Sequence, residues 1–288
     1  MSINKELIEL AELAGQVIQL PPVSHMYLPE PDPGPDKNTE FGVVGLSDGS
    51  AGLYYAWLGD TQKGMMDRFP IAQVAGTSPL LLARYCLGKD EAERSLGLAA
   101  VNAITRVVFR RADFVPEAAS DSLGSLDVRA GDHVGMVGYF PSLVRRLRDL
   151  GVKVTVVEKK TRFMGSDGTV NIVPDADALR DCNKVLSTAS TLLNDSTDGI
   201  LRCVAGAEYI VFVGPTAGFF PDPLFARGVT AIGGTEILDL EAVLERLRRN
   251  EPLGDSVRKF LLHRKDYPGT EHLLNNLTSG MKLNDGSP

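Results

Sequence analysis

The stretch HVGMVGYFPSLVRRLRDLGVKVTVVEKK, His133 to Lys160, decides the fold class. It begins with a short apolar run, continues with apolar residues at helical spacing up to a glycine, and ends with a second apolar run. Two short buried strands joined by an amphipathic helix are typical of a parallel β-sheet with helices on its faces. The sequence therefore predicts an α/β unit that starts near His133.

The pattern on either side of this stretch predicts the domain organisation. Strand and helix patterns keep alternating as far as DLEAVLERLRRN, which ends at Asn250. The earlier half instead contains a helix from about Asn4 to Leu20, a β-hairpin around Ser47-Asp-Gly-Ser, and two helical patterns. We therefore expect an α+β domain over residues 1–115, a parallel-sheet domain over residues 116–265, and a loosely ordered polar tail over residues 266–288.

The bulk composition excludes several classes of protein. The chain has 288 residues, 43% of them hydrophobic, and a formal net charge of −7, which disfavours a nucleic-acid-binding protein. Its three widely spaced cysteines do not suggest a disulfide framework. The first 20 residues contain Glu6, Glu9 and Glu12 and do not resemble a signal peptide. No apolar run is long enough for a membrane span, so we expect a cytoplasmic protein that does not bind membranes.

In an open α/β sheet the ligand lies outside the carboxyl ends of the strands, near the point where the strand order reverses. The segments that follow the predicted strands are therefore the candidates for a ligand site. The residues expected there are Gly138, Tyr139, Phe140, Glu158, Thr188, Gly214, Pro215, Thr216, Gly234 and Thr235.

Glu158 is the first candidate for chemistry. It follows the second strand, 20 residues after Gly138, where a nucleotide-binding fold places the acid that holds a ribose diol. The segment GMVGYFPSL is not the dinucleotide fingerprint, because Pro141 replaces its third glycine. The alternative is that Glu158 is a solvated acid beside Lys159 and Lys160.

A second group of candidates comes from the hydroxyl-rich stretch STASTLLNDSTDG. Asn194, Asp195 and Ser196 precede a helical pattern, and Thr188 and Thr191 follow a buried strand. Small hydroxyl donors beside a helix N-terminus suit an anion or a polar heterocycle. The alternative is an ordinary helix cap in a polar loop.

The stretch GPTAGFF, Gly214 to Phe220, combines backbone freedom, one hydroxyl and two aromatic rings. We expect it to form one wall of the site, with Phe219 or Phe220 covering the ligand and the other ring anchoring the loop. A purely structural role for at least one ring is the alternative.

Several well-known catalytic motifs are absent from the sequence. It contains no P-loop, no G-x-S-x-G, no H-E-x-x-H and no C-x-x-C, and its four histidines and three cysteines do not show metal-site spacing. The only local acids that could serve as catalytic groups at the predicted edge are Glu158 and Asp195. No cofactor can be named from these residues.

Taken together, the motifs VGYFPSL, VVEKK, TASTLLNDST, VGPTAGFFPDPLFARGV and IGGTEILD resemble the DUF364 family, which is named for heavy-metal chelation. The motif SLGLAAVNA resembles the DUF4213 domain that usually precedes it. The resemblance spans roughly residues 5–255. It implies an enolase N-terminal-like domain followed by a Rossmann-like domain, and a role in heavy-metal chelation or in making a small chelator.

The resemblance also bears on individual residues. The family's Thr-x-x-Asn-Gly-Thr pattern falls on Thr191, Asn194, Asp195 and Ser196, with Asp195 in place of the usual glycine. The family's Gly-Pro-Ser falls on Gly214 to Thr216. Asn102, in the DUF4213-like motif, lies on an otherwise apolar helix face and must find buried partners; we expect it to face the ligand cleft.

Three functional hypotheses follow. The first is a protein that binds and transforms a small polar ligand, nucleotide- or pterin-like, in an inter-domain cleft. The second is direct metal binding by oxygen ligands from Glu158, Asp195 and Asp222, because the cysteines and histidines do not cluster. The third is a non-catalytic scaffold. A small molecule is the expected partner, and self-association as a homodimer or other homo-oligomer is left open.

Overall fold

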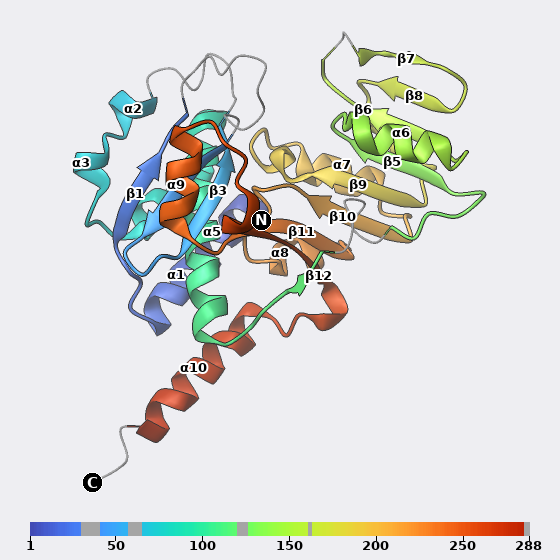
Figure 1. Cartoon of the computed structure of the whole chain (residues 1–288). Helices are drawn as coiled ribbons and strands as arrows, with labels where there is room; N and C mark the ends of the chain where they lie inside the picture. The colour runs from blue at the N-terminus through green and yellow to red at the C-terminus, as the bar shows by residue number, and fades with distance from the viewer. Residues whose placement is uncertain (30–40, 57–64, 120–125, 161–162, 285–288) are drawn as a thin grey trace.

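Two separate β-sheets form the framework of the protein within residues 1–29, 41–56, 65–119, 126–160 and 163–284, which the computed structural model describes (Figure 1). The smaller sheet has the strand order β1-β2-β3. The larger has the order β4-β12-β11-β10-β9-β5-β6-β8-β7. The architecture is a mixed α/β fold with a large, mostly parallel sheet, as the sequence predicts.

The first half of the chain builds the smaller sheet and the helix that packs on it. Helix α1 is capped by Ser2, and the long helix α5 is capped by Asp90. Gly52 in β3 allows α5 to approach closely, because a Cβ there would lie 2.1 Å from the carbonyl oxygen of Ala99. The elements are α1 (Ile3–Val17), β1 (Val23–Tyr27), β2 (Phe41–Leu46), β3 (Ala51–Tyr55), α2 (Met65–Arg68), α3 (Ile71–Val74), α4 (Pro79–Ala83), η3 (Arg84–Leu87) and α5 (Glu91–Arg111).

The second half builds the larger sheet, in which β8, β6, β5, β9, β10 and β11 run parallel. Its strands are short and almost entirely apolar, as expected for strands buried on both faces. The elements are β4 (Glu117–Ala118), β5 (His133–Val137), α6 (Pro141–Asp149), β6 (Lys153–Val157), β7 (Gly165–Ser166), β8 (Val170–Val173), η5 (Ala176–Leu179), β9 (Lys184–Thr188), η6 (Ala189–Leu192), α7 (Thr197–Cys203), β10 (Tyr209–Val213), α8 (Asp222–Phe225) and β11 (Ala231–Ile237).

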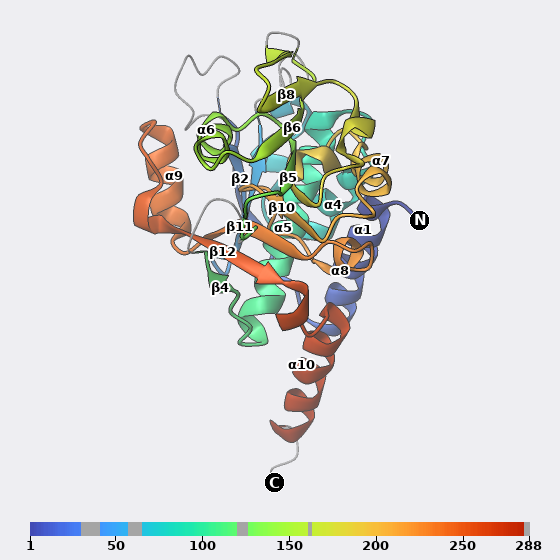
Figure 2. The same ribbon diagram turned by 90° about the vertical axis from the view of Figure 1, so that its right-hand side faces the viewer.

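The end of the chain differs from the loosely ordered tail that the sequence predicts. After α9 (Leu240–Arg248) and η7 (Gly254–Ser256), the strand β12 (Val257–His263) pairs antiparallel with β11. After η8 (Arg264–Asp266), helix α10 (Thr270–Asn284) begins where Asp222 accepts a hydrogen bond from the backbone N–H of Thr270, 3.0 Å away. Leu273 and Leu274 are buried, so these two apolar residues anchor a helix that otherwise projects from the body of the protein (Figure 2).

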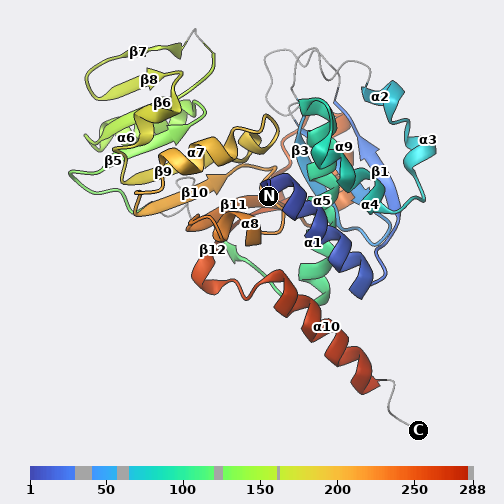
Figure 3. The same cartoon turned by 180° about the vertical axis from the view of Figure 1, so that it is seen from behind.

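The two halves interlock. Helix α9 belongs to the second half, yet it covers the face of the small sheet opposite α5 (Figures 1 and 3). Its residues Leu240, Val243, Leu244 and Leu247 form one core cluster with Val43 and Leu53, among others. The largest core cluster also draws residues from both halves. The division near residue 116 therefore separates two sheets that share their packing. Residues 120–125 belong to the turn-rich stretch Arg110–Asp132, where the sequence predicts the boundary, and lie outside the described residues.

Candidate functional site

The strand order reverses between β5 and β9. From β5 the chain continues to β6 and β8 on one side, and then returns to β9 on the other side of β5. Such a reversal leaves a crevice outside the carboxyl ends of the two diverging strands. The segments at these ends are Gly138 to Phe140 and the loop that begins at Thr188.

Gly138 shapes the end of β5. Its backbone has φ = +88°, which favours glycine, and its N–H donates to the carbonyl oxygen of Val157, 2.9 Å away. A Cβ at this position would lie 3.2 Å from Cγ2 of Thr188. The ends of β5 and β9 therefore approach each other closely, and a larger residue at position 138 would press on Thr188.

Glu158 is fixed at the same edge by backbone groups. Its Oε2 accepts a hydrogen bond from the N–H of Tyr139, 3.1 Å away, and its Oε1 accepts one from the N–H of Lys160, 2.9 Å away. The carboxylate is half-buried and ties the end of β6 to the end of β5. Each oxygen has a further lone pair that a ligand hydroxyl could use.

Tyr139, whose N–H bonds to this carboxylate, also belongs to an aromatic pair. The ring of Tyr139 stacks on the ring of Phe163, with centroids 4.8 Å apart and an interplanar angle of 29°. Sequence reasoning selects Tyr139 and misses Phe163, which lies outside the predicted strand ends. Phe140 is half-buried and packs against the core beneath α6.

The hydroxyls that follow β9 bond mainly to their own loop. Thr188 accepts a hydrogen bond from the N–H of Ser190, and Thr191 donates to the carbonyl oxygen of Thr188, 3.0 Å away. Thr197 donates to the buried hydroxyl of Thr191 across 2.9 Å. These contacts match the alternative reading, in which Thr188 and Thr191 stabilise a turn.

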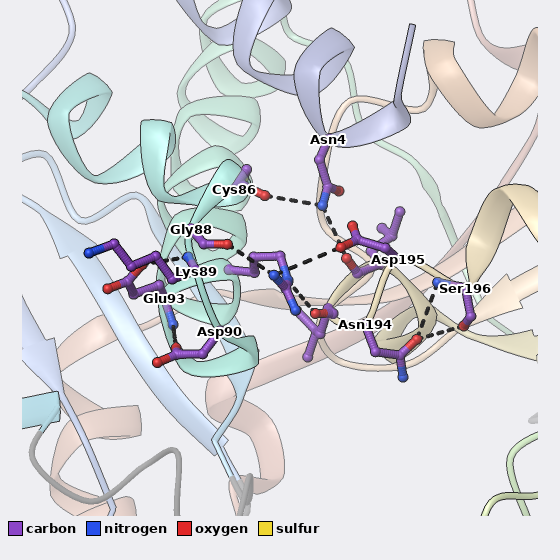
Figure 4. Close-up of polar contacts among 12 residues, drawn as sticks. Asn4, Cys86, Gly88, Lys89, Asp90, Glu93, Asn194, Asp195 and Ser196 are labelled. Carbon is purple, nitrogen blue, oxygen red and sulfur yellow. Dashed lines mark hydrogen bonds and ion pairs between the residues drawn. The ribbon is translucent and has the colours of Figure 1, made fainter.

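Asn194, Asp195 and Ser196 form the tip of this loop (Figure 4). The Oδ1 of Asn194 accepts hydrogen bonds from both the N–H and the hydroxyl of Ser196, at 3.3 and 2.6 Å. Asp195 has φ = +55°, a left-handed conformation that glycine adopts more easily than a residue with a side chain. Its carboxylate is 70% exposed and lies 3.8 Å from Nη1 of Arg94.

The first half of the protein fixes the position of this loop (Figure 4). The side-chain amide of Asn4 donates to the carbonyl oxygens of Cys86 and Leu192, each 3.1 Å away. Arg94 donates to the carbonyl oxygens of Gly88 and Leu193. Sequence reasoning misses both residues, although a buried asparagine on the apolar face of α1 is a signal that it must find partners.

The segment from Gly214 to Phe220 has a different role from the one predicted. Phe219 and Phe220 are 2% and 0% exposed and belong to the core, so both rings pack the interior and neither covers a surface. Thr216 is also buried, and its carbonyl oxygen accepts a hydrogen bond from Asn102 across 2.8 Å. Gly214, with φ = +136°, and the half-buried Pro215 remain at the carboxyl end of β10.

The remaining candidates lie between the two sheets, where a cavity of about 30 Å³ has Asn102 and Thr235 among its lining residues. Gly234 lies next to it in β11 and lets the chain pass close to Ala217, because a Cβ there would be 2.4 Å from the carbonyl oxygen. Neither Tyr139 nor Glu158 lines this cavity. The predicted site residues therefore do not form one site: some lie at the strand reversal, some at the end of β10, and others in the core or at the junction of the two sheets.

A larger cleft, of about 630 Å³, lies between the β1–β2–β3 sheet and the start of α9. His25, Arg106 and Arg110 are among its lining residues, and Nε2 of His25 lies 3.6 Å from a carboxylate oxygen of Glu241. None of the predicted site residues lines it. The arginines could have been noticed in the sequence, because charged residues inside the apolar run of α5 require partners.

Metal-ligating side chains do not gather in the part of the chain that the structure describes, where no three His, Cys, Asp or Glu residues are grouped. Glu158 accepts from two backbone N–H groups, Asp195 faces Arg94, and Asp222 accepts from Tyr267 and Thr270. No helix among the described residues is long and apolar enough to cross a membrane.

Residues 121–260 match the model of the DUF364 family, which carries the description "Putative heavy-metal chelation". An uncharacterized protein from Methanocaldococcus jannaschii is 28% identical over 159 residues. The aligned stretch covers 55% of this chain and 60% of that relative.

Two crystal structures of DUF364 proteins of unknown function share the fold. The one from Desulfitobacterium hafniense aligns over 90% of this chain and 99% of its own, with a TM-score of 0.67 and 19% identity. The one from Pyrococcus horikoshii aligns over 89% of this chain and 99% of its own, with a TM-score of 0.64 and 17% identity. At these identities the similarity shows the fold alone, which extends over both halves of the chain.

Proposed function

We propose that this chain, whose residues 121–260 match a family described by heavy-metal chelation, binds and transforms a small polar ligand where β5 and β9 diverge. The ligand class that fits is a planar, nucleotide- or pterin-like heterocycle bearing hydroxyl groups. The role in chelation would be to make or handle a small chelating molecule.

The observation that carries this proposal is the reversal of strand order between β5 and β9, with the features that surround it. Gly138 allows close backbone approach, the stacked rings of Tyr139 and Phe163 are only partly buried, and Glu158 offers a carboxylate held by two backbone N–H groups. Stacking and hydrogen bonding to a fixed acid are the two interactions that a hydroxylated heterocycle needs.

Glu158 is the stronger of the two candidate acids for proton transfer. It is half-buried at the reversal, and its two backbone contacts hold it in one orientation, as a catalytic group requires. Asp195 is mostly exposed and faces Arg94, so an electrostatic role at the rim of the site suits it better. A role in making or handling a chelator, in place of direct metal binding, also agrees with the absence of a cluster of metal-ligating side chains among the described residues.

The test compares two glycines with positive φ. Gly138→Ala places a methyl group at the proposed site, 3.2 Å from Thr188, whereas Gly131→Ala, at φ = +93°, points into open space before β5. Each substitution should cost about 1–2 kcal/mol of stability through the strained backbone. Thermal shifts of wild type and both variants would be measured with AMP and with neopterin as probes.

We expect at least one probe to raise the melting temperature of the wild type and of Gly131→Ala, and not that of Gly138→Ala. A shift that survives in Gly138→Ala would place the ligand elsewhere. Mass spectrometry of compounds that co-purify with the protein would identify the natural ligand if neither probe binds.

Direct metal binding makes a different prediction for the purified protein. Elemental analysis is expected to find no stoichiometric zinc, copper or nickel, because the described residues offer no group of ligands with the required geometry. Stoichiometric metal that is lost in Cys86→Ser, Cys182→Ser or Cys203→Ser would reverse this conclusion in favour of direct chelation.

A further inference from the structure

The cavity of about 30 Å³ lies between the two sheets, at the junction of β3, α5, β11 and β12. Most of the residues that line it are apolar or glycine, and a few are polar. These are Asn102, Thr105 and Arg106 from α5, and Thr235 and Glu236 from β11.

Asn102 lines this cavity and has an unmatched acceptor. The residue is 3% exposed, and both hydrogens of its amide nitrogen are used, by the carbonyl oxygens of Leu53 at 2.9 Å and Thr216 at 2.8 Å. These two acceptors fix the orientation of the amide, because the opposite orientation would set three oxygens against one another. Its Oδ1 is buried and has no hydrogen-bond partner among the described residues.

Arg106 lines both this cavity and the larger cleft, and it has an unmatched donor. One of its terminal nitrogens pairs with Oε1 of Glu236, whose other oxygen accepts from Arg258. The Nε–H of Arg106 is buried and has no partner in the described part of the chain. Because Asn102 and Arg106 are four residues apart on α5, their side chains share one face of the helix.

We propose that this cavity binds one water molecule, which accepts from the Nε–H of Arg106 and donates to Oδ1 of Asn102. A water molecule fits the complementary pair, because it both accepts and donates, and because a volume of this size holds one. An anion does not fit, because Oδ1 of Asn102 would then face another acceptor. The Glu236 carboxylate would also repel the anion.

This site has a structural consequence for the junction of the two halves. Asn102 bridges Leu53 of the small sheet to Thr216, and Arg106 bridges α5 to Glu236 of the large sheet. The water molecule would join these two bridges into one hydrogen-bonded network. Buried polar networks of this kind hold their members in a single arrangement when every member is satisfied.

The direct test uses the wild-type protein. In a high-resolution crystal structure we expect one peak within hydrogen-bond distance of Nε of Arg106 and Oδ1 of Asn102. In solution, the Nε–H resonance of Arg106 is expected to show a cross-peak to a long-lived water molecule in nitrogen-edited NOESY and ROESY spectra. An empty cavity, a peak larger than one water, or a direct contact between the two side chains would each overturn the proposal.

A matched pair of variants tests which atoms hold the water. Arg106→Lys keeps a positive charge that can reach Glu236 but removes the Nε donor, so the peak is expected to lose at least half of its occupancy. Arg258 also pairs with the Glu236 carboxylate but does not line the cavity. Arg258→Lys therefore changes that ion pair without removing a donor from the cavity, and the water peak is expected to stay. Equal occupancy in both variants would show that Arg106 does not hold the water.

Discussion

Two residues with a positive φ lie in the segments that follow the strands at the reversal. Gly138 follows β5, and Asp195 lies in the loop after β9. A glycine adopts this conformation freely, whereas a residue with a Cβ is strained in it. At Asp195 the chain therefore carries a side chain in a strained backbone conformation, and the carboxylate faces Arg94.

This conformation predicts an unusual order of stability at position 195. Asp195→Gly and Asp195→Ala both remove the weak, exposed contact with Arg94, so they differ only in backbone strain. We expect the glycine variant to be the more stable by about 1 kcal/mol in urea unfolding. At Asp198, in the first turn of α7, both variants remove the contact with Arg227, and the order should invert, because glycine is less favourable than alanine in a helix by up to about 1 kcal/mol. The same order at both positions would contradict the left-handed assignment.

At the scale of elements, the start of β5 is fastened to the start of β9 by one carboxylate. Asp132 accepts hydrogen bonds from the side chain of Asn183 at 2.7 Å and from the N–H of Arg129 at 2.6 Å, and its carboxylate lies 2.9 Å from Nζ of Lys184. Burial alone would raise the pKa of Asp132, but these hydrogen bonds together with the charge of Lys184 lower it to about 2. The contact lies at the edge of the sheet opposite the proposed ligand site.

The lowered pKa predicts how this contact depends on pH. Because the folded pKa lies below the value of about 3.9 for an unfolded aspartate, the stabilisation is complete above about pH 4 and is lost as the pH falls toward 2. We expect Asp132→Asn to cost about 1–2 kcal/mol in urea unfolding at pH 7 and almost nothing near pH 2. Asp149→Asn, on the exposed face of α6, is the control. A loss for Asp132→Asn that is the same at both pH values would refute the ionic explanation.

At the scale of the whole molecule, α9 makes the small sheet depend on the second half of the chain. Without α9, the sheet face that carries Val43 and Leu53 would be exposed to water. Burying such a face on a helix is what allows a three-stranded sheet to be stable. The two halves should therefore unfold together.

Leu244→Ala tests this dependence. The side chain is almost fully buried between α9 and the small sheet, so its loss should cost about 3 kcal/mol and leave one unfolding transition. Calorimetry would compare the measured and van't Hoff enthalpies, which agree for a single cooperative unit. Leu238→Ala, at a residue 55% exposed beside α9, should change stability by less than about 0.5 kcal/mol. Two separate transitions, only one of them lowered by Leu244→Ala, would show that the halves fold independently.

Local patterns in the sequence were sufficient to predict most of the helices and strands. Alternation of apolar strands with amphipathic helices predicts the parallel sheet, and the Ser-Asp-Gly turn predicts the β2–β3 hairpin. The ends of β5, β6 and β9 follow from the same pattern, so Gly138, Tyr139, Glu158 and Thr188 could be selected before the fold was known. These features depend on neighbours along the chain, which a sequence displays directly.

Contacts between distant segments decided the features of the fold that local patterns do not predict. The antiparallel β12, the docking of α9 on the small sheet, and the burial of Phe219 and Phe220 depend on residues far away in the sequence. The partners of Asn102 and Arg106 are equally remote, so the sequence shows that they need partners without showing which ones. The sequence by itself determined the elements and the edge where a ligand is expected. Only the tertiary structure decided the strand order and the partner of each buried polar group, because both arise from packing that brings distant segments together.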